Sequence, residues 1–331
     1  MNYIGSKVKL SQWIKEEITN KTDGKIEDKV FCDLFAGTGI IGRIFKKTVK
    51  KVISNDIEEY SYVLCRNYIQ NHEEIPNRDI LLQELNALPL REDGFIYKNY
   101  CLGSGSGRQY FSDENGKKID AARIAIREWK QIGKIKDDAY YFLLSSLLES
   151  ADKVANTASV YGAFLKNLKL SAQKPMDILP STFELNDNAH EAYQEDSNVL
   201  IRKISGDILY LDPPYNERQY GANYHILNTI AKYDNFVPEG KTGMRKYYRS
   251  NYCKKSKVLE NFEDLIKNAE FKYIFLSYNN EGLMSEDEIK QVMQKYGGYD
   301  LVKKEHQRYK ADSKRAYSAD YTFEYLHILH K

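Results

Sequence analysis

The clearest chemistry in this sequence lies in one short turn. Asp212-Pro213-Pro214-Tyr215 follows the apolar run Ile208–Leu211, which suits a buried strand. Two consecutive prolines fix the backbone and remove two N–H donors, so the turn is rigid and rich in hydrogen-bond acceptors. A turn that served only to stiffen the chain after the strand would need only the prolines. The acid before them and the aromatic ring after them indicate a functional turn.

Such a turn suits methyl transfer to an exocyclic amino group of a nucleic-acid base. The nitrogen of an adenine amino group is a poor nucleophile because its lone pair is delocalised into the ring. The Asp212 carboxylate and the Pro213 carbonyl can accept both amine hydrogens and aim the lone pair at a methyl donor, so positioning and electrostatics supply most of the catalysis. A base inside a duplex must first be flipped out, and Tyr215 offers a face for stacking it. We therefore predict that Asp212, Pro213, Pro214 and Tyr215 are catalytic.

A second turn, Asp33-Leu34-Phe35-Ala36-Gly37-Thr38-Gly39, predicts a cofactor site. It lies between an expected strand, 30–34, and the expected opening of a helix at 40–45, where glycines let the backbone approach a ligand closely. It fits neither the dinucleotide fingerprint nor the phosphate-binding loop, so we expect a ligand without pyrophosphate. Asp56 ends the next expected strand, 51–56, and is placed to bind ribose hydroxyls, although an acid there could instead cap the following helix.

The order of the expected elements predicts the fold class. Strands and helices alternate in the first part of the chain, with helices expected at 6–18 and 58–71, which favours an α/β fold with a doubly wound, mostly parallel, Rossmann-like sheet. Strand signals return at 192–193, 208–211 and 273–277, and 319–330 alternates like a closing antiparallel strand.

The alternation is interrupted from about residue 87. A Gly/Ser stretch, 103–107, and a polar, turn-rich segment, 111–118, precede two helical patterns at 121–132 and 137–151. We predict a catalytic domain formed by 1–86 and 182–331, with 87–181 inserted as a mainly helical target-recognition subdomain.

Composition limits the class of protein. A hydrophobic fraction of 42% and a charged fraction of 29% are typical of a soluble globular protein. There is no apolar run of the ~20 residues that a membrane span needs, and the N-terminus lacks the apolar core of a secretory signal. The four cysteines are scattered without metal-ligand spacing. We expect a cytoplasmic protein with reduced thiols and no metal.

The net charge of +2 does not itself indicate a nucleic-acid partner, but one segment does. Residues 241–257 contain seven basic side chains and no acidic one, and Tyr247, Tyr248 and Tyr252 lie among them. Basic groups can neutralise phosphates, and aromatic rings can pack on sugars or bases. A solvated loop is the alternative interpretation of this segment.

In combination these motifs resemble the Dam-like, alpha-group adenine-specific DNA methyltransferases, and within them the enzymes that partner type II restriction endonucleases. The resemblance covers nearly the whole chain. It rests on Tyr3-Ile4-Gly5-Ser6-Lys7, the glycine turn, Asp56, Asp212–Tyr215, Asn216–Tyr220, Asn223–His225, Arg108–Phe111 and Asn156–Ala163.

The resemblance implies S-adenosylmethionine as cofactor and assigns residues to it. Asp33 would hold the methionine ammonium, and Asp196 would lie near the cofactor adenine. The other implied cofactor contacts are Tyr3, Lys7, Phe35, Ala36, Gly37, Thr38, Gly39, Asp56 and Asp212.

Double-stranded DNA is the expected partner, with a restriction endonuclease linked genetically but not physically, no membrane, and a monomeric state. His225 could act as a base, although a histidine in such a place more often packs or hydrogen-bonds. The predicted DNA or target contacts are Arg108, Tyr110, Lys166, Lys169, Arg218, Tyr220, Asn223, Tyr224, His225, Arg245, Lys246, Arg249 and Asn279.

Three alternatives stay open at this point. Methylation of the cytosine N4 amine needs almost the same chemistry, although those enzymes more often carry Ser at the position of Asp212. RNA is another possible substrate, but the large insertion favours duplex DNA. A non-catalytic DNA-binding module with a relic cofactor site is the third, and the intact Asp212 and glycine turn argue against it.

Overall fold

The structure is a computed structural model that describes residues 7–22, 24–307 and 321–331. The described chain forms two compact units. The sheet unit comprises residues 7–57, 188–219 and 248–331, and the helical unit comprises 58–187 and 220–247. Among the described helices, none combines the length and the apolar character that crossing a bilayer requires.

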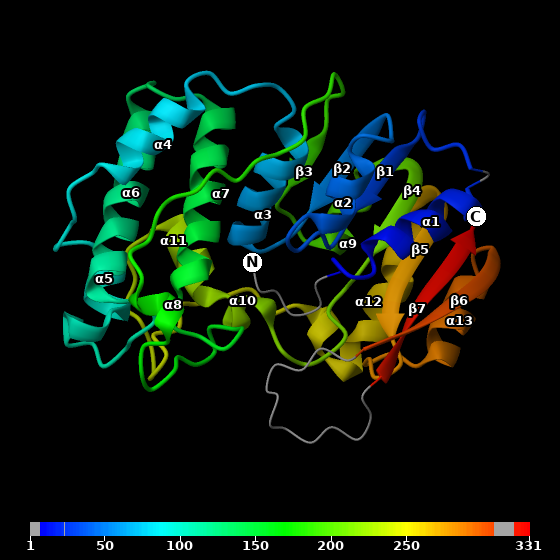
Figure 1. Ribbon diagram of the computed structural model, residues 1–331. Helices are drawn as coiled ribbons and strands as arrows, with labels where there is room; N and C mark the ends of the chain where they lie inside the picture. Colours follow the sequence, from blue (N-terminus) through cyan, green and yellow to red (C-terminus); the bar gives the residue numbers. More distant parts are fainter. Residues whose placement is uncertain (1–6, 23, 308–320) are drawn as a thin grey trace. The chain divides into compact units, whose positions relative to one another are not determined.

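The sheet unit is built on one mixed sheet with the strand order β3-β2-β1-β4-β5-β7-β6. All neighbours from β3 to β5 pair in parallel, whereas β7 is antiparallel to both β5 and β6 (Figure 1). The strands are β1 (Val30–Asp33), β2 (Lys51–Asn55), β3 (Glu191–Tyr193), β4 (Ser205–Leu211), β5 (Glu270–Asn279), β6 (Gly298–Gln307) and β7 (Tyr321–His330).

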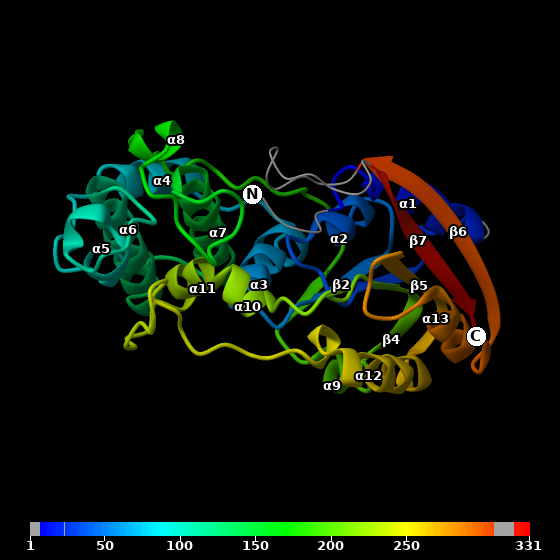
Figure 2. The same ribbon diagram turned by 90° about the horizontal axis from the view of Figure 1, so that it is seen from below.

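Helices cover both faces of this sheet. α1 and α2 lie on one face, and α9 and α12 on the other (Figure 2). On the first face the rings of Phe31 and Phe45 stack with their centroids 4.1 Å apart. The helices of this unit are α1 (Ser11–Lys21), α2 (Ile40–Phe45), α9 (Ser197–Leu200), the 3-10 helix η3 (Asn251–Cys253), α12 (Lys255–Asn268) and α13 (Glu286–Gln294).

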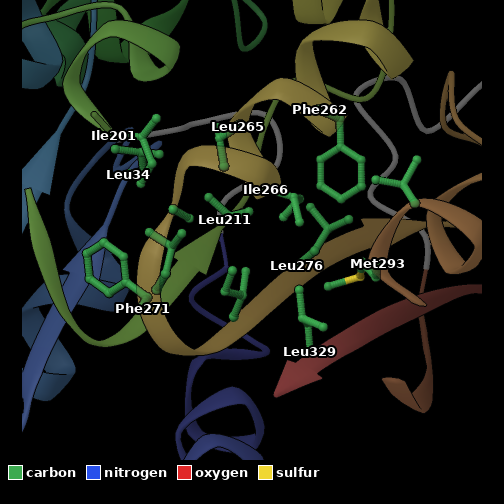
Figure 3. Close-up of a cluster of buried hydrophobic side chains, with 14 of the residues drawn as sticks. Leu34, Ile201, Leu211, Phe262, Leu265, Ile266, Phe271, Leu276, Met293 and Leu329 are labelled. Atoms are coloured by element: carbon green, nitrogen blue, oxygen red, sulfur yellow. The ribbon is translucent and has the colours of Figure 1, made fainter. Parts of the chain in front are cut away.

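The main core of the sheet unit lies under α9, α12 and α13. Apolar positions on α12, including Phe262 and Leu265, meet Leu211 of β4 and Leu276 of β5 (Figure 3). Both strands are buried along nearly their whole carboxyl-terminal halves, as expected of parallel strands covered on two faces. The core therefore fixes the strand end from which the Asp212–Tyr215 turn leaves.

The helical unit packs around α7, which contacts α3, α6 and α11. Its helices are α3 (Glu59–Cys65), the π-helix η1 (Arg66–Gln70), α4 (Arg78–Asn86), α5 (Phe95–Tyr100), the 3-10 helix η2 (Leu102–Ser104), α6 (Asp113–Gln131), α7 (Asp137–Val154), α8 (Leu170–Gln173), α10 (Tyr220–Asn223) and α11 (His225–Lys232). Buried polar groups join distant parts of this unit. The Arg123 guanidinium donates to the carbonyls of Ile230 and Ala231 at 2.9 and 2.8 Å.

The predicted fold class is confirmed, including the closing antiparallel strand. The interpretation of 111–118 as a turn was wrong, because α6 already begins at Asp113, where the Ser112 hydroxyl accepts the Asn115 N–H as a helix cap. The compact helical unit also extends beyond 87–181 on both sides, because α3 and α11 pack on α7.

Candidate active site

The two motif-bearing turns leave neighbouring strands at the same edge of the sheet. β1 and β4 pair in parallel with Asp33 opposite Tyr210, and the Leu34 N–H donates to the Tyr210 carbonyl at 3.2 Å. Carboxyl ends of adjacent parallel strands form the ligand-binding edge of an α/β sheet. The fold therefore brings the glycine turn and Asp212 together, as the sequence predicts.

Asp212 belongs to a buried cluster of charges. Its Oδ1 lies 3.1 Å from the Lys7 Nζ, and the same ammonium donates to Glu324 Oε1 at 2.8 Å. The Ser277 hydroxyl also donates to Glu324 Oε1. Lys7 and Glu324 are only 6% and 4% exposed, so these charges interact with little screening by water.

The environment of Asp212 raises the pKa of its carboxyl to about 7. Burial is the largest cause, and the negative charge of Glu324 adds to it, while the Lys7 ammonium acts in the opposite direction. The pKa of Lys7 is held well above its usual value by the two carboxylates, although burial opposes this. Lys7 is thus a permanent cation beside Asp212.

Tyr215 is held in place from two sides. Its ring meets that of Tyr278 edge to face, with 6.2 Å between centroids, and its carbonyl accepts the Leu283 N–H at 3.1 Å. The Lys7 ammonium lies 5.7 Å from the centre of the Tyr215 ring. Packing and a backbone hydrogen bond therefore fix the position of Tyr215.

The glycine turn has the conformation that its sequence predicts. Gly37 and Gly39 have φ values of 53° and 74°, which disfavour residues with a Cβ. The Gly37 N–H donates to the Asp56 carboxylate at 2.8 Å, and the Ala36 N–H donates to the Asn55 carbonyl at 2.9 Å. Asp56 thus closes the turn from the end of the neighbouring strand.

The carboxylate of Asp33 has the environment that best suits a cationic ligand. Its Oδ2 accepts the Gly42 N–H at 3.0 Å, whereas its Oδ1 is buried and accepts no hydrogen bond from the described residues. Burial raises the pKa of Asp33 to about 8, with smaller contributions from the charges of Asp212 and Asp56. An ammonium group would supply the missing donor and stabilise the ionised form.

Two other predicted cofactor residues lie at this part of the sheet. Phe35 meets Tyr252 edge to face, at 5.0 Å between centroids. Asp196 caps α9 by accepting the N–H groups of Asn198 and Val199, and it also accepts the Tyr248 hydroxyl at 2.6 Å. Its carboxylate is therefore already engaged. Tyr3 lies outside the described residues.

Three predicted target contacts are buried in the helical unit, and for them the prediction is not supported by the structure. Tyr110, Tyr224 and His225 are all 0% exposed. His225 Nε2 donates to the Tyr161 carbonyl at 2.9 Å, and burial lowers the pKa of the imidazole to about 4. Their side chains pack in the core of the unit, where Tyr110 contacts His225 and both Tyr110 and Tyr224 contact Tyr161.

Three of the predicted DNA-binding cations make hydrogen bonds or an ion pair within the protein. The Arg108 guanidinium donates to the carbonyls of Asn99, Gly240 and Lys241. The Lys169 ammonium donates to the Thr157 carbonyl, and Arg245 forms a two-pronged ion pair with Asp234 at 2.8 and 2.9 Å. The structure thus gives all three cations a local role in shaping loops.

The remaining predicted contacts are accessible. Tyr220 and Asn223 are half-buried. Asn279 is half-buried too and lines a pocket of about 240 Å³ together with Lys255 and Tyr325. The exposed cations are Lys166, Arg218, Lys246 and Arg249.

Glu324 was missed at the level of the sequence. Glu324 could have been noticed from the alternation of β7, because it lies on the same face of the strand as Leu326 and Ile328, which are buried. Among the described residues, no group of three or more His, Cys, Asp or Glu side chains could hold a metal ion, and all four cysteines are free and buried.

The chain is similar to known proteins over most of its length. Residues 3–292 match the family model described as D12 class N6 adenine-specific DNA methyltransferase. The chain is 64% identical to Type II methyltransferase M.NlaIII of Neisseria lactamica, over 100% of this chain and 99% of the relative. It is 38% identical to M.CviAII of Paramecium bursaria Chlorella virus 1, covering 94% of this chain and 93% of the relative. It is also 38% identical to M.FokI of Planomicrobium okeanokoites, of which it covers 53%.

Proposed function

The chain belongs to the D12 class of N6 adenine-specific DNA methyltransferases, and on this premise we propose that it transfers the methyl group of S-adenosylmethionine to adenine N6 at a specific site in duplex DNA. The observation that carries the proposal is the place of Asp212. It ends a core strand beside the glycine turn and is ion-paired with a buried lysine.

The residues of the glycine turn fit the methyl donor. We assign the methionine ammonium to Asp33, whose buried Oδ1 has no hydrogen-bond partner in the described structure. Asp56 is assigned to the ribose, and the backbone from Phe35 to Gly39 forms the wall of the pocket. When bound, S-adenosylmethionine supplies a sulfonium methyl, which bonds to the amine nitrogen as the carbon–sulfur bond breaks.

The catalytic turn acts on the target amine. The Asp212 carboxylate and the Pro213 carbonyl accept its hydrogens, which directs the nitrogen lone pair away from the ring. As the nitrogen gains a fourth bond it becomes acidic and releases one proton, and we assign Asp212 as the acceptor of this proton. Tyr215, held by Tyr278 and Leu283, stacks on the flipped adenine.

Exposed cations supply the contacts to the phosphate backbone in this proposal. Lys166, Arg218, Lys246 and Arg249 are exposed. Arg108, Lys169 and Arg245 instead hold loops through carbonyls and an ion pair. Phosphate contacts position a protein on DNA but do not read its sequence.

We further propose that the chain is the modification enzyme of a type II restriction–modification system. Relatives that match it over 93% or more of their own length are named type II methyltransferases. Sequencing of modified bases in DNA from an expressing host should show methyl groups on adenine N6 within one short motif. Matching protection from a methylation-sensitive nuclease would agree with this, and methylation scattered over unrelated sequences would contradict it.

The catalytic assignment is tested by Asp212→Asn. This variant keeps the size of the side chain but removes its charge, so methyl transfer should fall by at least about 10³-fold while DNA binding is retained. Asp187→Asn, which changes an exposed aspartate of the helical unit, is the matched control and should transfer normally. Near-normal transfer by Asp212→Asn would contradict the mechanism.

A further inference from the structure

We propose that Glu324 of β7 is a positioning residue for methyl transfer, which holds the Lys7 ammonium beside Asp212 and makes Asp212 a stronger acceptor for the proton that the target amine releases. The inference rests on the proposed function. It adds a residue 112 positions beyond Asp212, on the antiparallel strand that lies between β5 and β6.

The geometry gives Glu324 a defined hold on Lys7. Glu324 Oε1 accepts the Lys7 ammonium at 2.8 Å, which is closer than the 3.1 Å between that ammonium and Asp212 Oδ1. The Ser277 hydroxyl donates to the same Glu324 oxygen from the neighbouring strand β5. The ammonium is thus fixed from the β7 side, and Asp212 meets a cation that is already in place.

Glu324 is a second buried carboxylate on the ammonium that pairs with Asp212. The Lys7 ammonium lies 3.1 Å from Asp212 Oδ1 and 2.8 Å from Glu324 Oε1, so both negative charges act on one cation. Burying a charged side chain is costly. A glutamate on the buried face of β7 is therefore unfavourable for packing alone, and an effect of its charge on Asp212 would explain its presence.

That charge acts in the direction which proton transfer requires. Glu324 raises the pKa of Asp212 and Lys7 lowers it, with burial as the largest influence. Asp33, Tyr210 and Tyr215 also face this group and interact with it electrostatically. Lys7 keeps Asp212 ionised at the start, and Glu324 increases its affinity for the one proton that leaves the methylated nitrogen.

The pH dependence of kcat separates the effects of the two charges. Asp212 must be ionised to accept the proton, so activity is present above its pKa and is lost as the pH falls through it. Glu324→Gln removes a like charge and should move this acidic limb to lower pH by at least about 0.5 unit. It should also lower the plateau value of kcat, since Asp212 becomes a weaker base. Lys7→Met should move the limb to higher pH.

A surface pair provides the matched control. Glu263 forms an exposed ion pair with Lys295 at 2.7 Å, so Glu263→Gln removes a lysine-bound glutamate of the same unit without touching the site. It should leave both kcat and the acidic limb unchanged. If Glu324→Gln lowers activity equally at every pH, or if its limb moves in the same direction as that of Lys7→Met, the inference is overturned.

A milder variant tests positioning without a change of charge. Ser277→Ala removes the hydroxyl that holds Glu324, so kcat should fall by at least about threefold with the acidic limb unmoved and the KM for the donor unchanged. A wild-type kcat in this variant would overturn the positioning role. These results are distinguishable from failure of the proposed function, which would show as absence of adenine methylation by the wild-type protein itself.

Discussion

Asp33 combines two properties that rarely occur together in a purely structural residue. It is a buried carboxylate, and one of its oxygens accepts no hydrogen bond in the described part of the chain. Its pKa of about 8 lies far above the ordinary value of 3.8, chiefly because of burial. An unpaired buried carboxylate lowers the stability of the free protein, and a cationic ligand reverses this effect.

Asp33→Asn is therefore expected to stabilise the free protein while weakening donor binding. The folded state keeps the Asp33 proton up to about pH 8, whereas the unfolded state loses it near 3.8, so the stability of the wild type falls as the pH rises through this window. The gain in Tm of the variant should accordingly be larger at pH 8 than at pH 5. Calorimetric titration should show about 10- to 100-fold weaker binding of S-adenosylmethionine. Unchanged affinity would contradict the assignment.

The residues that sequence reasoning found and those that it missed differ in a physical respect. Asp212 and Gly37 lie in local motifs whose chemistry is complete within a few positions. Glu324 meets Lys7 across 317 positions of sequence, so no local pattern could reveal their contact. For His225 the sequence left two interpretations open, a target contact or a packed histidine, and the buried position of its side chain favours the second.

At the scale of elements, one asparagine controls the long loop after α7. The fully buried Asn156 donates from Nδ2 to the carbonyls of Gln109 and Leu165, and its Oδ1 accepts the Lys169 N–H at 3.0 Å. The loop so held presents the exposed Lys166.

Asn156→Ala should leave these backbone groups without their partner and cost about 2–4 kcal/mol of unfolding free energy. Hydrogen exchange should show faster exchange at the Lys169 amide, and the KM for DNA should rise because the loop is no longer held. Asn167→Ala changes an exposed asparagine of the same loop and serves as control. Protection of the Lys169 amide equal to that of the wild type would rule out this role for Asn156.

The elements that could be predicted are those whose signal is local. β1, β2 and β4 are short apolar runs that end in polar turns, and the start of α2 at Ile40 was predicted. α5 was not predicted, because its first N–H groups are capped by Asp120 from α6, 24 positions further on. β6 was also missed, since it is an edge strand with charged residues that pairs only with β7.

At the scale of the whole molecule, the compact units do not follow the order of the sequence. Asn228 of α11 accepts the Tyr60 N–H and donates to Glu58, so segments about 170 positions apart form one helical unit. Interrupted strand signals could reveal that an insertion exists. They could not show that α3 and α11 pack with it, because this depends on long-range contacts. The functional division into a catalytic domain and a recognition subdomain remains a prediction.

The distribution of charge over the whole chain leads to the last prediction. A net charge of +2 gives little general attraction to DNA, so affinity must come from local exposed cations. If Lys246 and Arg249 each neutralise one phosphate, changing both to alanine removes two contacts. The slope of log K against log salt concentration should then become shallower by about 1.8, which is twice the ~0.9 expected for each phosphate on duplex DNA. Lys290→Ala, which changes an exposed lysine on α13, should leave the slope unchanged. An unaltered slope in the double variant would show that Lys246 and Arg249 do not contact the phosphate backbone. Other cations would then neutralise the phosphates, and the exposed Lys166 and Arg218 would be the next residues to change.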